Sequence, residues 1–138
     1  MIEYLKTILN ELYTDWFNNK KYWFTKKKDI DILLCNKYYN KLEILINIKN
    51  IETINFTKIE LIGLIILLDQ IPRHYKRLNV NEYIDVDNYS KKATKFSKII
   101  IENNYNCNID ELCFIYLPYR HINDIENIIK IIKIFIDL

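Results

Sequence analysis

The apolar residues of the chain recur at steps of three and four positions, the spacing typical of an α-helix that buries one face. One such stripe consists of Ile2, Leu5, Leu9, Leu12 and Trp16. A second stripe begins at Ile30 and ends at Leu45, and its length predicts a helix of about five turns. A basic and aromatic connection, residues 18–28, joins these two predicted helices.

The segment 58–70 is apolar nearly all round, which is typical of a helix at the centre of a helical protein. Thr57, followed by Glu60 three residues later, matches a capping box and predicts where this helix begins. Pro72 has no amide hydrogen and disfavours helical dihedrals at Ile71. We therefore expect the central helix to stop or kink at this point.

The segments 85–103, 109–116 and 124–137 also carry helical spacing. Pro118 follows the second of them, and we expect it to end that helix. Consecutive helices with short connections are typical of an antiparallel array. The sequence therefore predicts an all-α fold, a single helical domain over residues 1–138, with about six helices.

The last predicted helix has apolar residues on more than one side. Its main stripe consists of Ile125, Ile128, Ile129, Ile132 and Phe135. Ile131 and Ile134 lie off this stripe, so they form a candidate surface for a protein or peptide partner, or for a second copy in a homodimer.

Composition supports the helical interpretation and narrows the function classes. Half of the 138 residues are apolar, enough for one core, while one Gly and two Pro are too few turn-formers for an all-β fold. The formal net charge is +2 with both signs interspersed. The chain therefore lacks the basic footprint of a protein that binds nucleic acid or a membrane surface.

Neither a membrane span nor a secretion signal is predicted. The longest apolar run, 61–68, is far too short to cross a bilayer, and Glu3 and Lys6 interrupt the first apolar stretch. The three cysteines form no Cys-x-x-Cys pair, which indicates free thiols in a reducing compartment. We therefore expect a cytoplasmic protein.

The densest polar cluster, residues 69–77, follows directly on the apolar central helix. Arg73 and Arg77 lie one helical turn apart, so their guanidinium groups could bind one carboxylate or phosphate bidentately. In the alternative interpretation, Asp69 caps the following turn and pairs with Arg73 as a structural hinge.

A second polar cluster, residues 117–124, contains His121. An imidazole titrates near neutrality, so His121 is the natural acid/base candidate. A purely structural hydrogen-bonding role near a helix start is the alternative. The segment Lys20–Lys28 interleaves lysines with Trp23 and Phe24, as in proteins that stack RNA bases. These rings could equally anchor the connection to the core.

Other chemical signatures are missing from the chain. Its one glycine, Gly63, lies inside a predicted helix, so no glycine-rich phosphate loop is present. No Cys/His spacing predicts a metal site, and no cofactor is expected. Ser90 and Ser97 lie on a predicted helix without the context of a nucleophile elbow.

Two motifs together carry a family resemblance. Residues 64–77 read Leu-Ile-Ile-Leu-Leu-Asp-Gln-Ile-Pro-Arg-His-Tyr-Lys-Arg. They resemble the hallmark of the bacterial "domain of unknown function 924" family, in which an aliphatic helix runs into Leu-Asp-Gln-Phe-Pro-Arg-Asn. Phe114–His121 is similar to that family's Phe-Leu-Tyr-Leu-Pro-x-x-His. Further likenesses in the expected order are Trp16-Phe17, Trp23-Phe24, Asp29 or Asp31, and Tyr83–Asp87.

The resemblance implies an all-α fold with a tetratricopeptide-like, right-handed superhelical array, and it implies no established reaction. Where the family usually has Ser-Glu after the histidine, this chain has Ile122-Asn123, so a carboxylate is lost or is replaced by Asp124. Members also tend to continue into a further helical segment with Arg and His, which does not follow Leu138 here.

Three hypotheses follow. An interaction module or a pocket that has lost catalysis ranks first, a small-molecule enzyme or binder of an anionic ligand second, and RNA binding through Lys20–Lys28 third. The pocket would form where the central helix ends and the Leu-Pro-x-x-His segment begins. Its candidate residues are Asp69, Gln70, Arg73, Arg77, His121, Asp124 and Trp16. In it, His121 and Asp69 would transfer protons and Trp16 would form an apolar wall.

Overall fold

The computed structural model describes all residues 1–138 and contains helices without any strand. The α-helices are α1 (Ile2–Phe17), α2 (Lys28–Tyr38), α3 (Leu42–Ile46), α4 (Lys58–Asp69), α5 (Ile71–Leu78), α6 (Val86–Glu102), α7 (Ile109–His121) and α8 (Ile125–Ile136). Short 3-10 turns cover Lys20–Tyr22, Tyr39–Lys41 and Ile51–Thr53. The predicted all-α helical array is confirmed, while its tetratricopeptide-like packing stays a prediction.

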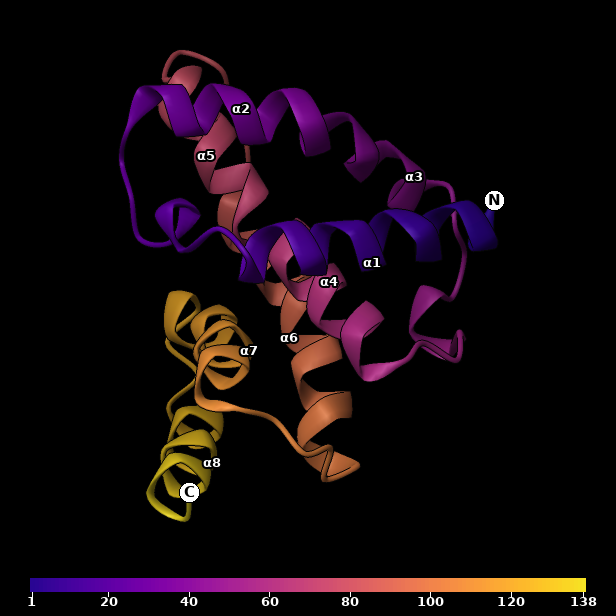
Figure 1. The fold of residues 1–138 in the computed structure, drawn as a ribbon, viewed down its shortest axis with the longest axis vertical. Helices are drawn as coiled ribbons and strands as arrows, with labels where there is room; N and C mark the ends of the chain where they lie inside the picture. Colours follow the sequence, from indigo (N-terminus) through magenta and orange to yellow (C-terminus); the bar gives the residue numbers. More distant parts are fainter.

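The helix α4 lies at the centre, packed against α1, α6 and α7 (Figure 1). Every residue from Leu61 to Asp69 is buried. The predicted capping box is present: the Glu60 amide donates to Thr57 Oγ1 (3.2 Å), and the Thr57 amide donates to Glu60 Oε1 (3.0 Å). A Cβ on Gly63 would lie 2.6 Å from the Leu9 carbonyl oxygen, so α1 crosses α4 at glycine distance.

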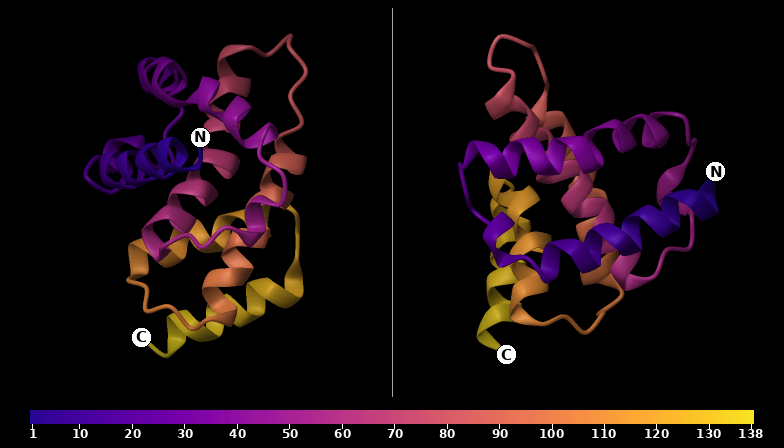
Figure 2. Two further views of the ribbon diagram at one scale, coloured as in Figure 1. Left: turned by 90° about the vertical axis from the view of Figure 1, so that its right-hand side faces the viewer. Right: turned by 45° about the horizontal axis from the view of Figure 1, so that its top comes forward.

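The outer helices pack mainly on their neighbours, α2 on α5 and α8 on α7. In Figures 1 and 2, α2 lies at one end of the molecule and α8 at the opposite end, where the C terminus lies. The helices share one hydrophobic cluster of 27 buried residues, to which α4 contributes most. None of the helices combines the length and apolar character that a membrane crossing requires.

The expected stop or kink is present, since α4 ends at Asp69 and α5 begins at Ile71. Gln70 keeps helical dihedrals (φ −91°, ψ −45°), and Ile71 already begins α5, so the expectation that Pro72 excludes Ile71 from helical geometry is wrong. The Gln70 carbonyl accepts from the amides of both Arg73 and His74 at 3.2 Å. This tight first turn needs no amide from Pro72, and it directs α5 away from the axis of α4.

Two other helix ends differ from expectation. Pro118 lies inside α7, which continues to His121 instead of ending at Tyr116. The helix loses only the hydrogen bond that an amide hydrogen at position 118 would donate. The Ile122 amide still donates to the Pro118 carbonyl at 3.2 Å. The predicted helix 30–45 is divided into α2 and α3 at Tyr38, whose φ of −126° leaves the helical range.

The face that α8 buries is rotated from the predicted stripe. Ile131 is fully buried and Ile134 packs against the core, so neither is available to a partner, contrary to the sequence-based prediction. The exposed apolar residues on α8 are instead four isoleucines, Ile125, Ile129, Ile132 and Ile136. Apolar residues cover more of the circumference of α8 than α7 can bury. Only one part of this apolar surface therefore contacts the rest of the protein.

Candidate functional site

A polar cavity of about 180 Å³ lies where the connection after α1 approaches α5 and the last turns of α7. Its lining consists of Phe24, Thr25, Lys26, Gln70, Arg73, His74, Arg77, Leu117 and His121. Three of these side chains are cationic and two are histidines, while no carboxylate lines the cavity. Both histidines of the chain therefore line one small space together with three cationic side chains.

The bend at Gln70 and the persistence of α7 past Pro118 place these groups together. Arg73, His74 and Arg77 follow the bend on successive positions of α5, and His121 occupies the end of α7. If α7 ended before Pro118, as the sequence suggested, the backbone after it would not carry His121 on the helix. The two polar clusters, distant in sequence, thus face each other across the end of α4.

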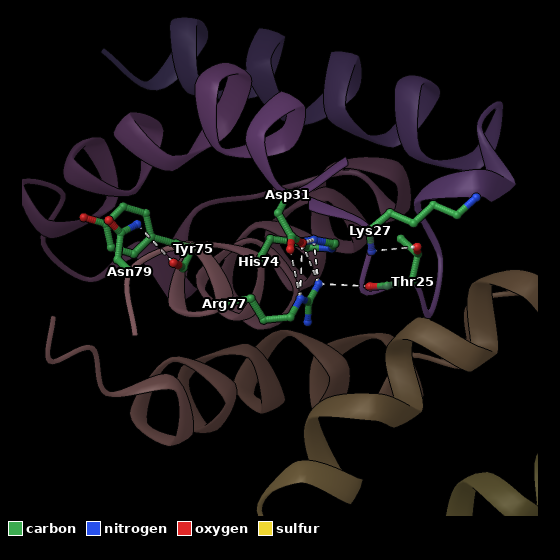
Figure 3. A network of polar contacts seen from close by, with 7 residues as sticks. All are labelled: Thr25, Lys27, Asp31, His74, Tyr75, Arg77 and Asn79. Atoms are coloured by element: carbon green, nitrogen blue, oxygen red, sulfur yellow. Dashed lines mark hydrogen bonds and ion pairs between the residues drawn. The ribbon is translucent and has the colours of Figure 1, made fainter. Parts of the chain in front are cut away.

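On one side of the cavity, Asp31 of α2 holds His74 and Arg77 (Figure 3). His74 Nδ1 lies 2.5 Å from Asp31 Oδ1, a separation that requires a proton between them, so Nδ1–H donates to the carboxylate. Arg77 Nη2 donates to Asp31 Oδ1 (2.8 Å) and to the Thr25 carbonyl (3.1 Å). The guanidinium therefore ties α5 to both α2 and the connection before it.

Burial governs the charge of His74. Its side chain is 3% exposed, and this desolvation lowers its pKa below the ordinary histidine value. The Arg77 charge lowers the pKa further, while the hydrogen bond to Asp31 and its charge raise it, and the net direction is downward. His74 is therefore neutral at pH 7, with its proton on Nδ1 and a lone pair on Nε2.

On the other side, Asp69 at the end of α4 accepts from three donors. His121 Nδ1 lies 2.8 Å from Asp69 Oδ1, Ser90 Oγ donates to the same oxygen (2.6 Å), and Gln70 Nε2 donates to Oδ2 (2.9 Å). Arg73 Nη2 donates to Ser90 Oγ at 2.8 Å. Asp69 is 1% exposed, so this network stabilises a charge that would be costly to bury alone.

The structure brings together five of the sequence-based candidates and places the other two elsewhere. Gln70, Arg73, Arg77 and His121 line the cavity, and Asp69 lies directly behind His121. Trp16 is fully buried and meets His74 edge-on, with ring centroids 6.3 Å apart, so it lies beneath the cavity rather than in its wall. Asp124 caps α8 by accepting from the Asn127 amide (3.3 Å).

Sequence reasoning missed four residues of this site. Asp31 and His74 form the second carboxylate–histidine pair, Lys26 lines the cavity, and Ser90 joins Arg73 to Asp69. The family resemblance marked Asp31 only as one of two alternatives. Helical spacing could have indicated Asp31, because it lies one residue after Ile30 on the edge of the buried face of α2, but not its partner.

The aromatic residues after α1 are used within the protein. Trp23 Nε1 donates to the Trp16 carbonyl (2.9 Å), and its ring meets Phe114 edge-on at 5.1 Å between centroids. Phe24 stacks on Phe114 with an interplanar angle of 9°, and Lys20 pairs with Asp110 at 3.7 Å. The aromatic rings that would stack on RNA bases thus already contact protein groups, so RNA binding gains no support from their packing.

Each of the two histidines has one nearby carboxylate, and no group of three or more His, Cys, Asp or Glu side chains converges anywhere in the structure. Such pairs supply fewer ligands than the three or four that zinc sites use in proteins. All three cysteines are unpaired. The groups that characterise this site are therefore its cationic side chains and its two imidazoles.

Comparison with known proteins places the chain in a family. A sequence model described as "Bacterial protein of unknown function (DUF924)" matches residues 12–138, nearly the whole chain, and the chain belongs to that family. No curated protein and no solved structure matches it. The matched region contains all lining residues of the cavity and both histidine–aspartate pairs.

Proposed function

We propose that the polar cavity binds the anionic group of a small molecule. The observation that carries this proposal is the gathering of Lys26, Arg73, Arg77 and two histidines around one space without a carboxylate in its lining. A volume of 180 Å³ holds about six water molecules at ~30 Å³ each. This size suits a phosphate or carboxylate group, alone or as the end of a larger molecule that extends into solvent.

The arginines are oriented before any ligand arrives. Ser90 fixes Arg73, and Asp31 with the Thr25 carbonyl fixes Arg77. Each guanidinium group still has a terminal nitrogen, Nη1, without a hydrogen-bond partner in the protein. A ligand that accepts from these nitrogens gains charge-assisted hydrogen bonds without ordering two long side chains, which lowers the entropic cost of binding.

The proposal extends to proton transfer by His121. Its Nδ1 is held by Asp69, so Nε2 is the nitrogen that remains for a ligand. Asp69 orients the ring, as a carboxylate does behind a histidine that acts as acid or base. His121 is 24% exposed, so the ring is open to exchange of protons with a bound ligand or with solvent.

Nuclear magnetic resonance can test the proposal directly. The chain has two histidines, so His74→Gln and His121→Gln assign the two imidazole Cε1–H signals without ambiguity. Titration with inorganic phosphate and with acetate should shift both signals, and Arg73→Gln should weaken the phosphate response about tenfold, from the loss of one charge-assisted contact.

Lys98→Gln is the matched control, because it removes one charge from an exposed site on α6 away from the cavity. It should leave the phosphate affinity unchanged. Imidazole signals that respond to neither anion would overturn the proposal. An equal loss in Arg73→Gln and Lys98→Gln would reduce it to a general charge effect.

A second candidate function, self-association, is favoured by the exposed isoleucines of α8. Ile125, Ile129, Ile132 and Ile136 are 61%, 48%, 45% and 75% exposed and share one side of the helix. We propose that this stripe binds the same stripe of a second copy in antiparallel orientation. The flank of the stripe carries Glu126 in its first half and Lys133 in its second, so the antiparallel arrangement places opposite charges together.

Sedimentation equilibrium tests this second proposal. Ile129→Glu should convert a dimer into a monomer, because it places two carboxylates in the apolar contact. Val80→Glu is the control, since Val80 is 76% exposed in the connection after α5 and lies outside the stripe. A monomer at every concentration of the unaltered chain would refute the pairing.

A further inference from the structure

A second cavity, apolar and separate from the polar one, lies between α3, the loop that follows it, and the outer side of α6. Its volume is about 310 Å³, at the lower end of the ~300–1,000 Å³ typical of small-molecule sites. Its lining consists of Leu42, Leu45, Ile46, Ile48, Asn50, Ile51, Glu52, Leu68, Tyr89, Lys92, Lys95 and Phe96. Eight of these twelve residues are hydrophobic, and none lines the polar cavity.

The polar groups of this cavity are confined to a few positions. Lys92 and Lys95 lie one turn apart on α6, and neither forms a salt bridge within the protein. The Lys92 ammonium lies 5.8 Å from the centre of the Tyr89 ring, which keeps it beside the cavity. The one carboxylate in the lining, Glu52, leaves the two lysines in excess.

An apolar space with an unpaired cationic edge is complementary to a molecule that has an apolar tail and an anionic head. From this geometry we infer that the cavity binds a medium-chain fatty acid. The tail occupies the space between Leu42, Leu68 and Phe96, which are buried, and the carboxylate lies at Lys92 and Lys95. The volume corresponds to about ten water-sized groups at ~30 Å³ each, so we expect a tail of about that many carbons.

The charge separation also argues against neutral or cationic ligands. A neutral alkane derivative would fill the apolar part but would leave both lysines unpaired, and a cationic amphiphile would place like charges together. A peptide side chain could enter the same space. Binding of a peptide would depend on backbone contacts and not on the length of a free hydrocarbon tail. Varying the tail length therefore distinguishes a peptide site from a fatty-acid site.

Calorimetric titration of the full chain with hexanoate, octanoate and decanoate, below their micellar concentrations, tests the inference. Burial of each methylene contributes about 0.8 kcal/mol, so each should lower the Kd about fourfold and each pair about fifteenfold. Decanol, which has the same tail without the charge, should bind more weakly than decanoate. No dependence of the Kd on chain length would overturn the inference.

Substitutions at the edge of the cavity test the head group. The double variant Lys92→Gln/Lys95→Gln should weaken decanoate binding about fivefold and leave decanol binding unchanged. A fivefold change corresponds to the upper range of the energy that an exposed ion pair contributes. Lys92→Arg/Lys95→Arg should retain decanoate binding because it keeps both charges. Lys91→Gln/Lys98→Gln removes the same charge from exposed positions of α6 outside the cavity and should have no effect.

Circular dichroism of each variant confirms that the helices persist, which exposed substitutions on α6 should not disturb. Equal decanoate binding by the chain and by Lys92→Gln/Lys95→Gln would overturn the assignment of the head group. Loss of phosphate binding at the polar cavity would leave this inference intact, because the two sites share no lining residue.

Discussion

The two histidine–aspartate pairs use the same contact, imidazole Nδ1 to a buried carboxylate, in two different surroundings. His74 is 3% exposed, and Arg77 shares its carboxylate. His121 is 24% exposed, and its carboxylate also accepts from Ser90 and Gln70 and lies 4.0 Å from Arg73 Nε. The first pair is therefore built as a structural tie between α2 and α5, whereas the second keeps an imidazole available at the edge of a cavity.

Chemical type alone therefore does not assign a role to a histidine–aspartate pair. Protonation of the buried, neutral His74 would destabilise the fold, because burial lowers its pKa, while the His121 ring is partly exposed to solvent. Substitutions on the two sides should consequently produce effects of unequal size.

Asp31→Ala should lower the free energy of unfolding by about 3 kcal/mol, because it removes the shared partner of a buried imidazole and a partly buried guanidinium. Urea denaturation measures the change. Asp29→Ala, which removes an exposed carboxylate from the first turn of the same helix, should cost only a few tenths of a kcal/mol. Similar losses in both variants would mean that Asp31 contributes only to the helix dipole.

His74→Ala and His121→Ala compare the pairs themselves. The first should cost about 2 kcal/mol, because it leaves a cavity and a less satisfied Asp31, and the second less than about 1 kcal/mol, because water can reach Asp69. Thermal and urea unfolding monitored by circular dichroism provide both values. A larger loss in His121→Ala would reverse our assignment of structural and functional roles.

Ser90→Ala should lower stability by about 1.5 kcal/mol, since a buried hydroxyl that donates to a carboxylate is lost. The same variant frees Arg73, so the phosphate affinity should fall together with stability. Ser97→Ala is the matched control, because Ser97 is equally buried on α6 but donates to the Ile115 carbonyl. It should affect stability without changing phosphate binding.

The pH dependence of stability should carry the signature of His74. Its pKa is lowered in the folded chain, so the unfolded chain binds more protons just below pH 6.5, and stability falls as the pH decreases through that value. The slope from one group stays under about 1.4 kcal/mol per pH unit. Unfolding of His74→Gln between pH 5 and 7 should show a smaller slope than the unaltered chain, and an identical slope would exclude His74 as the source.

Local signals predicted the helix starts well. The capping box at Thr57 and Glu60 depends on residues three positions apart, and the structure contains it. Helix ends at prolines were predicted less well, because a proline removes one hydrogen bond and the surrounding contacts decide whether the helix continues. Pro118 shows this, since α7 continues past it and buries it against the protein.

The candidate site was predicted in part. Polar residues directly after an apolar helix indicated Asp69, Arg73 and Arg77, because such groups need partners when the helix is buried. Nothing local indicated that Asp31 would accept from His74, since the two residues belong to helices that meet only in the folded chain. The buried face of α8 was misjudged for a related reason: its apolar arc is wide, and the position of α7 selects which part is covered.

The sequence by itself determined the helical class, the start of most helices and the central place of α4, because hydrophobic spacing and capping act over a few neighbouring residues. Only the tertiary structure decided which carboxylate holds which histidine, and that both imidazoles line one cavity. Pairing across helices depends on the directions in which α5 and α7 leave their bends, and those directions follow from packing of the whole core.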